Sequence, residues 1–486
     1  MGNNIDMQPN ALWQYFDEIC HIPRKSGNEE RIITYLMEFA KKHQLETKKD
    51  KTGNLLIIKP ASSGYKNRKP VCLQSHVDMV CEKNNTISHD FEKDPILTTV
   101  EGNWMKAKGT TLGADNGIGI AAQLTILKDK NIKHGLLECL FTVDEEMGLR
   151  GAFNIKPKFF NSKILINLDS EDEGELFIGS AGGINTTAHI GYKTKNNPKN
   201  HLAYKIDITG LKGGHSGDDI DKGRGNSIKI LNRFLWIANK KLKLRLVKFE
   251  GGNLSNAIPR EAYAQFTIPA KIEQLLKKHI NQFIIAINNE LRTTEPDLRI
   301  SLTSIKSPKK VLKKGIQNKL LNILYACPNG VIAMSRSVKG LVETSTNLAS
   351  VKFNNKNNIL ITTSQRSSVE SAKVNISNAV SSVFSMAKAK VEHTDGYPGW
   401  NPNLESEILR ITKESYKKLF GSNPKVRAIH AGLECGLFLE KYPDLDIISF
   451  GPTITDAHSP DEQINIQSTR KFWDLLTDVL SNIPEE

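Results

Sequence analysis

The chain has 486 residues, of which 39% are hydrophobic and 24% are charged. This is an ordinary globular mix with enough apolar chain for about two to four structural units. The formal net charge is +13, but the lysines are scattered and no zinc-finger or RNA-recognition motif occurs. A solvated basic surface is therefore favoured over a nucleic-acid-binding one.

The sequence also argues against secreted and membrane classes. The six cysteines lie far apart with no C-x-x-C pair, which indicates reduced thiols rather than a disulfide framework. No run approaches the roughly 18 apolar residues of a membrane span. The N-terminal sequence contains no apolar signal core. We therefore expect a cytoplasmic enzyme without a membrane partner.

The first 180 residues alternate between helix and strand patterns. Three segments have helical apolar spacing: residues 11–20, 29–45 and 117–129. Four short apolar runs are typical of strands: residues 54–60, 70–78, 136–144 and 163–171. Strands that alternate with helices in this way predict an α/β layered domain.

The pattern changes between residues 184 and 392, where strands such as LAYKIDITGL and EAYAQFTIP are separated by long helical patterns. This segment predicts a second, α+β unit. Residues 393–403 are rich in Gly, Pro and Asn and indicate a crossing back to the first unit. We therefore expect one α/β domain, residues 1–183 and 393–486, interrupted by an inserted domain at 184–392.

Acidic residues and histidines recur where the apolar strands of the first and last parts end. The residues concerned are His76, Asp78, Asp115, Glu145, Glu146, Asp169 and His458. In open α/β sheets, ligands bind outside the carboxyl ends of the strands, so these side chains are candidates for a single crevice.

Each of these residues has a simpler explanation when it is taken singly. His76 is a candidate half-buried histidine, Asp115 a helix cap, and Glu145 with Glu146 a solvated acidic pair. The recurrence at several strand ends favours a shared site. Several carboxylates in one crevice would repel each other unless a cation offset their charge.

The donor types indicate which cation this would be. Two histidines and three carboxylates without a thiolate suit Zn, Mn or Co. One carboxylate can bridge two ions about 3.5–4 Å apart, as in two-metal aminopeptidases. The chemistry also needs a general base that is not itself a metal ligand.

Several long motifs resemble the M20 metallopeptidases: SHVDMV, GTTLGADNGIGIA, TVDEEMGLRGA, NLDSEDEGELFIGSAGG and DAHSPDE. GLKGGHSGDDI and IHAGLECGLF are similar to the dipeptidase subgroup that acts on aminoacyl-histidine substrates. The resemblance covers nearly the whole chain. It implies a zinc-peptidase-like α/β catalytic domain, with a mixed sheet flanked by helices, and an inserted α+β lid and dimerisation domain.

The resemblance also implies the roles of the residues at the strand ends. Two zinc ions would be bound by His76 with Asp169, by Glu146 with His458, and by a bridging Asp115. Asp78 would orient the imidazole of His76. Glu145 would be the general base, which activates water and later protonates the leaving amine.

The resemblance implies further residues that act on the substrate. His215 would stabilise the oxyanion, from its own chain or from a partner subunit, although a turn histidine among glycines is the simpler interpretation. Asn256 and Arg366 are candidates for the substrate carboxylate, and Glu434 for the amine pocket. The inserted segment is longer than one simple lid, so we expect two sub-lobes.

The function that the resemblance implies is hydrolysis of unblocked dipeptides, including Xaa-His dipeptides such as carnosine. It would need two Zn²⁺, with Co²⁺ or Mn²⁺ as substitutes, and relatives suggest a homodimer. One alternative is hydrolysis of N-acyl amino acids. A remote alternative is a basic nucleic-acid-binding protein with a structural metal.

Overall fold

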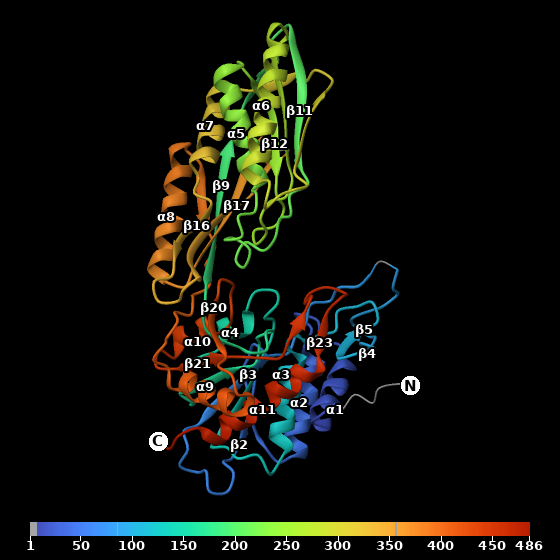
Figure 1. Cartoon of the computed structure of the whole chain (residues 1–486), viewed down its shortest axis with the longest axis vertical. Coiled ribbons are helices and arrows are strands. Elements are labelled where there is room, and N and C mark those ends of the chain that lie inside the picture. Colours follow the sequence, from blue (N-terminus) through green and yellow to red (C-terminus); the bar gives the residue numbers. More distant parts are fainter. Residues whose placement is uncertain (1–6, 85, 355–356) are drawn as a thin grey trace. The chain divides into compact units, whose positions relative to one another are not determined.

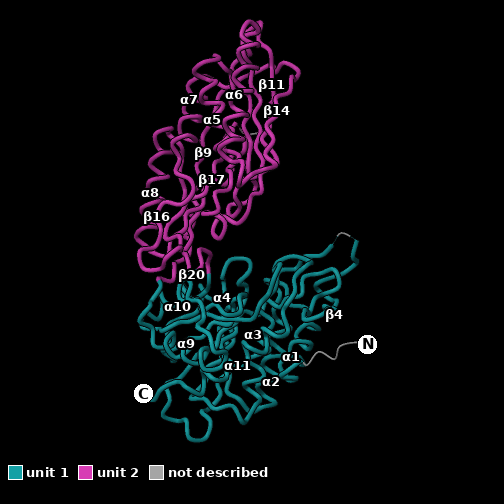
Figure 2. The backbone as a smooth tube through the Cα atoms, viewed as in Figure 1, with its two compact units in different colours: residues 1–179, 402–428, 433–486 teal, residues 180–401, 429–432 magenta. Residues whose placement is uncertain are grey.

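The computed structural model describes residues 7–84, 86–354 and 357–486, and the chain folds into two compact units (Figures 1 and 2). Unit 1 comprises Met1–Gly179, Pro402–Ala428 and Leu433–Glu486, and unit 2 comprises Ser180–Asn401 and Ile429–Gly432. The expected insertion at 184–392 falls inside unit 2.

Unit 1 is built on an eight-stranded sheet with the order β1-β2-β6-β3-β7-β21-β8-β20. Its strands are β1 Glu46–Lys49, β2 Leu55–Lys59, β3 Val71–His76, β6 Leu137–Thr142, β7 Ile164–Asn167, β8 Glu175–Ser180, β20 Lys425–Ile429 and β21 Asp446–Ser449. β3 pairs in parallel with β6 and β7, and β7 pairs in parallel with β21. β2 pairs antiparallel with both β1 and β6, so the sheet is mixed.

The central strands are rich in apolar residues because the sheet buries them on both faces. Every residue of β3, β6 and β7 is buried. The helices of unit 1 are α1 Asn10–Cys20, α2 Glu30–Lys42, α3 Ala114–Lys128, α4 Arg150–Asn154, α9 Glu407–Phe420, α10 Cys435–Lys441 and α11 Ile466–Asn482. α3 is buried around nearly its whole circumference, since it packs against both α1 and β3.

A small four-stranded sheet in unit 1 has the order β22-β23-β5-β4. Its strands are β4 Thr98–Glu101, β5 Trp104–Ala107, β22 Ile454–Thr455 and β23 Gln463–Asn465. β23 pairs antiparallel with β5, the strand from which the chain continues toward α3. This sheet therefore anchors the β22–β23 loop, which carries His458, to the strand that precedes Asp115.

Unit 2 contains a nine-stranded sheet in which all the assigned strand pairs are antiparallel. Its order is β14-β11-β13-β12-β17-β18-β9-β19. β16 lies outside this order and pairs with β17. The strands are β9 Gly182–Gly191, β11 His201–Thr209, β12 Arg245–Gly251, β13 Ala262–Pro269, β14 Arg299–Ser304, β16 Gly330–Met334, β17 Val342–Asn354, β18 Asn358–Ser367 and β19 Lys390–His393. A separate ribbon pairs β10 Thr194–Asn196 with β15 Lys310–Leu312.

Four helices pack with this sheet to form the core of unit 2: α5 Ser227–Lys241, α6 Glu273–Leu291, α7 Lys314–Ala326 and α8 Glu370–Met386. A short 3₁₀ helix, Ala270–Ile272, precedes α6. The core includes Phe234 of α5, Phe266 of β13 and Phe384 of α8, all with 0% exposure.

The sheet order reveals two sub-lobes of the same topology. β11-α5-β12-β13-α6-β14 forms one βαββαβ set, and β9-α7-β17-β18-α8-β19 forms a second. The first set is inserted into the second, between β9 and α7. The two sets join where β12 pairs with β17. The second unit thus contains the two sub-lobes that its length suggests.

Two further features of the structure concern the cysteines and the helices. All six cysteines are free, and five of them are buried. Within the described ranges, no helix has both the length and the apolar character that a membrane crossing requires.

Candidate metal centre

The first candidate ligand is His76, the last residue of β3, whose side chain is 1% exposed. Its Nδ1 lies 3.4 Å from Oδ1 of Asp78, a fully buried carboxylate two residues further along the chain. Its Nε2 lies 2.9 Å from Oδ1 of Asp115 and 3.2 Å from Oδ1 of Asp169. Nδ1 of His76 thus faces Asp78, while Nε2 faces two further carboxylates.

The second histidine, His458, lies in the β22–β23 loop and approaches the other side of the same aspartate. Its Nε2 is 3.2 Å from Oδ2 of Asp115 and 3.0 Å from Oε2 of Glu146. One oxygen of Asp115 thus faces each histidine. The structure brings together the five residues that the sequence suggested as ligands, in two groups that share Asp115.

Glu145 and Glu146 lie in the loop just after β6, which ends at Thr142. The main-chain N–H groups of both glutamates donate to Asp78, at 3.0 Å to Oδ1 and 3.2 Å to Oδ2 respectively. Asp78 therefore accepts hydrogen bonds from this loop and also contacts the imidazole of His76. Because the strand has ended, the two adjacent carboxylates are free to turn to the same side.

The proximity of these groups shifts their pKa values strongly. Contacts with Asp115 and Glu146 raise the pKa of His458 to about 11, although burial opposes the rise. Burial lowers the pKa of His76, but Asp169, Asp115 and Asp78 together raise it well above the ordinary value. Without another cation, both imidazoles retain protons that balance the carboxylates.

The pKa values of the carboxylates shift in opposite directions. Burial would raise the pKa of Asp115, but hydrogen bonds with His458 and His76 hold it well below the ordinary range. Burial raises the pKa of Glu145 well above its usual value, and the charges of Asp169 and Glu146 add to this rise. Burial and these charges therefore favour the protonated form of the Glu145 carboxyl group.

The donor set fits two divalent cations. His76, Asp115 and Asp169 offer atoms that all lie within 4.8 Å of one another, and so do Asp115, Glu146 and His458. In addition, Oε1 of Glu146 is buried without a hydrogen-bond partner in the described part of the chain. Imidazole and carboxylate donors suit Zn²⁺ and its transition-metal neighbours.

A second polar cluster lies in unit 2 around His215. Arg366 donates from Nη2 to Nε2 of His215 at 3.2 Å, and Nδ1 of His215 lies 3.1 Å from Oδ2 of Asp218. Nη1 of Arg366 donates to the hydroxyl of Tyr397 at 3.0 Å. The structure thus brings two of the sequence-predicted residues together within unit 2, with Asp218 and Tyr397 as partners that the sequence did not reveal.

The other two candidates have different surroundings. Asn256 is exposed, and its main-chain carbonyl accepts from the N–H of Ser216, next to His215. Glu434 is fully buried in unit 1, where its Oε2 accepts from Gln74 at 2.6 Å and from Thr142 at 2.8 Å. Its role in an amine pocket stays a prediction.

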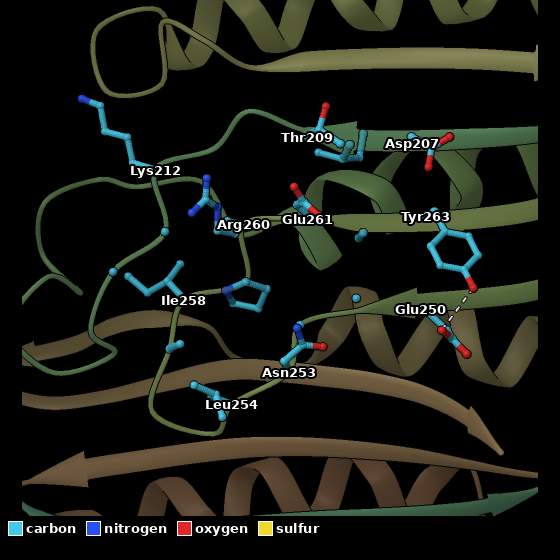
Figure 3. Close-up of a pocket in the computed structure, with 18 of the residues that line it drawn as sticks. Asp207, Thr209, Lys212, Glu250, Asn253, Leu254, Ile258, Arg260, Glu261 and Tyr263 are labelled. Carbon is cyan, nitrogen blue, oxygen red and sulfur yellow. Dashed lines mark hydrogen bonds between the residues drawn. The ribbon is translucent and has the colours of Figure 1, made fainter. Parts of the chain in front are cut away.

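A groove of about 770 Å³ opens on unit 2 beside the loops that carry His215 and Asn256 (Figure 3). Tyr263 donates to Oε2 of Glu250 at 3.1 Å within it. Six charged side chains line it: Asp207, Glu250, Glu261, Lys212, Arg260 and Lys352. Because the two signs balance, the groove favours neither anions nor cations.

Comparisons with known proteins show which family the chain belongs to. The model of peptidase family M20/M25/M40 matches residues 72–482. The chain is 45% identical over 484 residues to the cytosol non-specific dipeptidase of Escherichia coli (strain K12), with 100% of both chains covered. The chain therefore belongs to peptidase family M20/M25/M40 and is a peptide-bond hydrolase, as the sequence motifs predicted.

Solved structures give the same result for the fold. The crystal structure of aminoacylhistidine dipeptidase from Vibrio alginolyticus matches with a TM-score of 0.90 and 42% identity, covering 99% of this chain and 98% of that one. Aminopeptidase PepT from Bacillus cereus matches with a TM-score of 0.57 and 16% identity, covering 97% and 98%. The latter is a likeness of fold alone.

Proposed function

We propose that the protein is a dizinc dipeptidase that hydrolyses unblocked dipeptides, including Xaa-His dipeptides such as carnosine. The observation that carries the proposal is the arrangement around Asp115, whose two oxygens face His76 and His458 separately. The full-length similarity to a cytosol non-specific dipeptidase and to an aminoacylhistidine dipeptidase supports the substrate class.

His76 and Asp169 would hold one ion, Glu146 and His458 the other, and Asp115 would bridge them. When bound, the ions supply Lewis acidity that polarises the peptide carbonyl and acidifies water. Zn²⁺ is the proposed metal, with Co²⁺ or Mn²⁺ as functional substitutes.

Glu145 performs the proton transfers in this proposal. It accepts a proton from the attacking water and later delivers that proton to the amine of the leaving amino acid. Its burial and its acidic neighbours raise its pKa, which strengthens it as a base. Asp78 keeps the loop in place through the N–H groups of both glutamates.

In the same proposal, unit 2 is an inserted lid domain that supplies side chains which bind the substrate. His215 would stabilise the oxyanion, while Arg366 and Asn256 would hold the substrate carboxylate. Arg366 is 6% exposed, and its guanidinium already contacts Tyr397 and His215. These contacts support a guanidinium that is positioned to bind a carboxylate rather than a surface arginine. We further propose a cytoplasmic homodimer.

A direct assay tests the substrate class. The purified enzyme with added Zn²⁺ is offered carnosine and Ala-His beside the N-acetyl derivatives of the same amino acids. We expect turnover of the free dipeptides and none of the acylated compounds. Turnover of only the N-acyl substrates would establish the deacylase alternative, and salt-dependent RNA or DNA binding without chelator-sensitive hydrolysis would establish the nucleic-acid alternative.

A further inference from the structure

Two buried residues of opposite charge, Arg24 and Glu462, hold the loop that leads into α3. Arg24 is 1% exposed and Glu462 is 2% exposed. Neither belongs to the groups of candidate metal ligands. Their contacts go to main-chain atoms of the segments that carry the proposed ligands.

Glu462 accepts hydrogen bonds from consecutive main-chain amides. Its Oε2 accepts from Leu112 at 2.7 Å and from Gly113 at 2.9 Å, and its Oε1 accepts from Ala114 at 2.8 Å and from Asp115 at 3.4 Å. These N–H groups open a helix, where a negative charge is favourable. A glutamine would place an NH₂ donor against two of them.

The position of Glu462 in the chain gives these bonds a second consequence. Glu462 lies four residues after His458 and directly precedes β23, and its own N–H donates to the carbonyl of Ser459 at 3.1 Å. A single side chain therefore joins the loop of one proposed ligand, His458, to the loop of the bridging ligand, Asp115.

Arg24 makes the corresponding connection to β3. Its Nη1 donates to the carbonyls of Val77 and Asp78 at 3.1 and 2.8 Å, and its Nη2 donates to the carbonyl of Gly113. A Cβ on Gly117 would lie 2.8 Å from Nη2, so the loop fits closely around the guanidinium. Arg24 thus ties the residues after His76 to the same loop.

We propose that Glu462 is a positioning residue for the metal centre: by holding the amides of Leu112–Asp115, it fixes Asp115 between His76 and His458 before any metal binds. Arg24 holds the opposite side of the loop. The inference rests on the proposed function, because it takes Asp115 as the bridging ligand.

The chain offers a matched control for this proposal in Glu138 of β6. Glu138 is also a buried carboxylate, 1% exposed, and it accepts from the N–H groups of Asn161 and Ser162 and from the hydroxyl of Ser162. It holds a loop that carries none of the proposed ligands. Glu138→Gln therefore measures how much the same chemical change lowers Zn²⁺ affinity when it is made away from the proposed ligands.

The first experiment is a Zn²⁺ titration against a chromophoric chelator for the wild type, Glu462→Gln and Glu138→Gln. We expect Glu462→Gln to bind Zn²⁺ about 10- to 100-fold more weakly, the usual cost of losing a group that supports metal ligands. Glu138→Gln is expected to keep the wild-type affinity. Unchanged affinity in Glu462→Gln, or an equal loss in both variants, would overturn the positioning role.

The second experiment needs no variant, so it remains decisive if Glu462→Gln does not fold. Hydrogen exchange of the metal-free wild type is expected to show protected amides at Leu112–Asp115, and Zn²⁺ is expected to change them little. Rapid exchange there without metal would contradict a preformed loop. A wild type that binds no Zn²⁺ while these amides are protected would instead defeat the proposed dizinc function alone.

Discussion

At the scale of single residues, Glu145 and Glu146 show how neighbouring carboxylates acquire separate environments. Glu146 reaches His458 at 3.0 Å, whereas burial raises the pKa of Glu145 well above the ordinary value. Asp78 holds the main chain of both residues. The two side chains therefore differ in partner and in proton affinity, although they are adjacent in sequence.

This difference predicts opposite outcomes for two conservative substitutions. Glu145→Gln should keep two metal ions per chain while kcat falls by about 10²- to 10⁴-fold, the usual contribution of a general base. Glu146→Gln should lose metal from one site. Metal content by atomic emission, measured beside kcat, distinguishes them. Metal loss in Glu145→Gln with retention in Glu146→Gln would exchange the two assignments.

The sequence revealed residues that act through their side chains, and it missed residues that act on the main chain. His76, Asp169 and Glu146 stood out because acidic and imidazole groups follow apolar strands, and family resemblance suggested their roles. Arg24 and Glu462 bond to carbonyls and amides, which every residue has. Such contacts leave no pattern of residue types, so only the fold reveals them.

At the scale of elements, the same contrast separates the predicted strands from the missed ones. β3 and β6 contain short apolar stretches, Val71–Leu73 and Cys139–Phe141, and were predicted, whereas β17 was not. β17 buries polar side chains such as Thr346 and Asn347, because Gln365 donates to Thr346 and Asn347 donates to the carbonyl of Ala257. When polar side chains make their hydrogen bonds inside a sheet, the strand that carries them has an amino-acid composition typical of a loop.

One such polar contact in unit 2 predicts a pH dependence of stability. Nε2 of His430 lies 2.7 Å from the hydroxyl of Ser345, and burial, followed by the charge of Arg366, lowers the pKa of His430 to about 4. The neutral imidazole thus contributes stability above pH 6.5, and this contribution is lost as the pH falls toward 4. Asp218 and His215 are the other charged or titratable groups that act on it.

The substitution His430→Gln isolates this effect. Relative to the variant, the wild type should lose up to about 3 kcal/mol between pH 6.5 and pH 4, since one pKa unit corresponds to about 1.4 kcal/mol. Denaturant midpoints at several pH values, followed by hydrogen exchange in β17 and β18, measure the difference. Parallel pH profiles for the two proteins would show that His430 does not titrate in this way.

At the scale of the whole molecule, the chain order explains why the two units were hard to delimit from sequence. All the proposed metal ligands belong to unit 1, but His458 reaches it only after the chain has completed unit 2. Within unit 2, one βαββαβ set is nested inside another. The β12–β17 pairing covers an edge that each set alone would leave open.

This division predicts that metal removal acts on unit 1 selectively. Without cations, the closely spaced carboxylates and imidazoles around Asp115 depend on bound protons, whereas bound ions stabilise the folded unit by about 4 kcal/mol at 1,000 times their Kd. Chelation should therefore accelerate hydrogen exchange in α3, β3 and β6 and leave β13 and β18 unchanged. Restoring Zn²⁺ should reverse the change. Equal acceleration in both units would mean that the metal centre stabilises the chain as a single cooperative body.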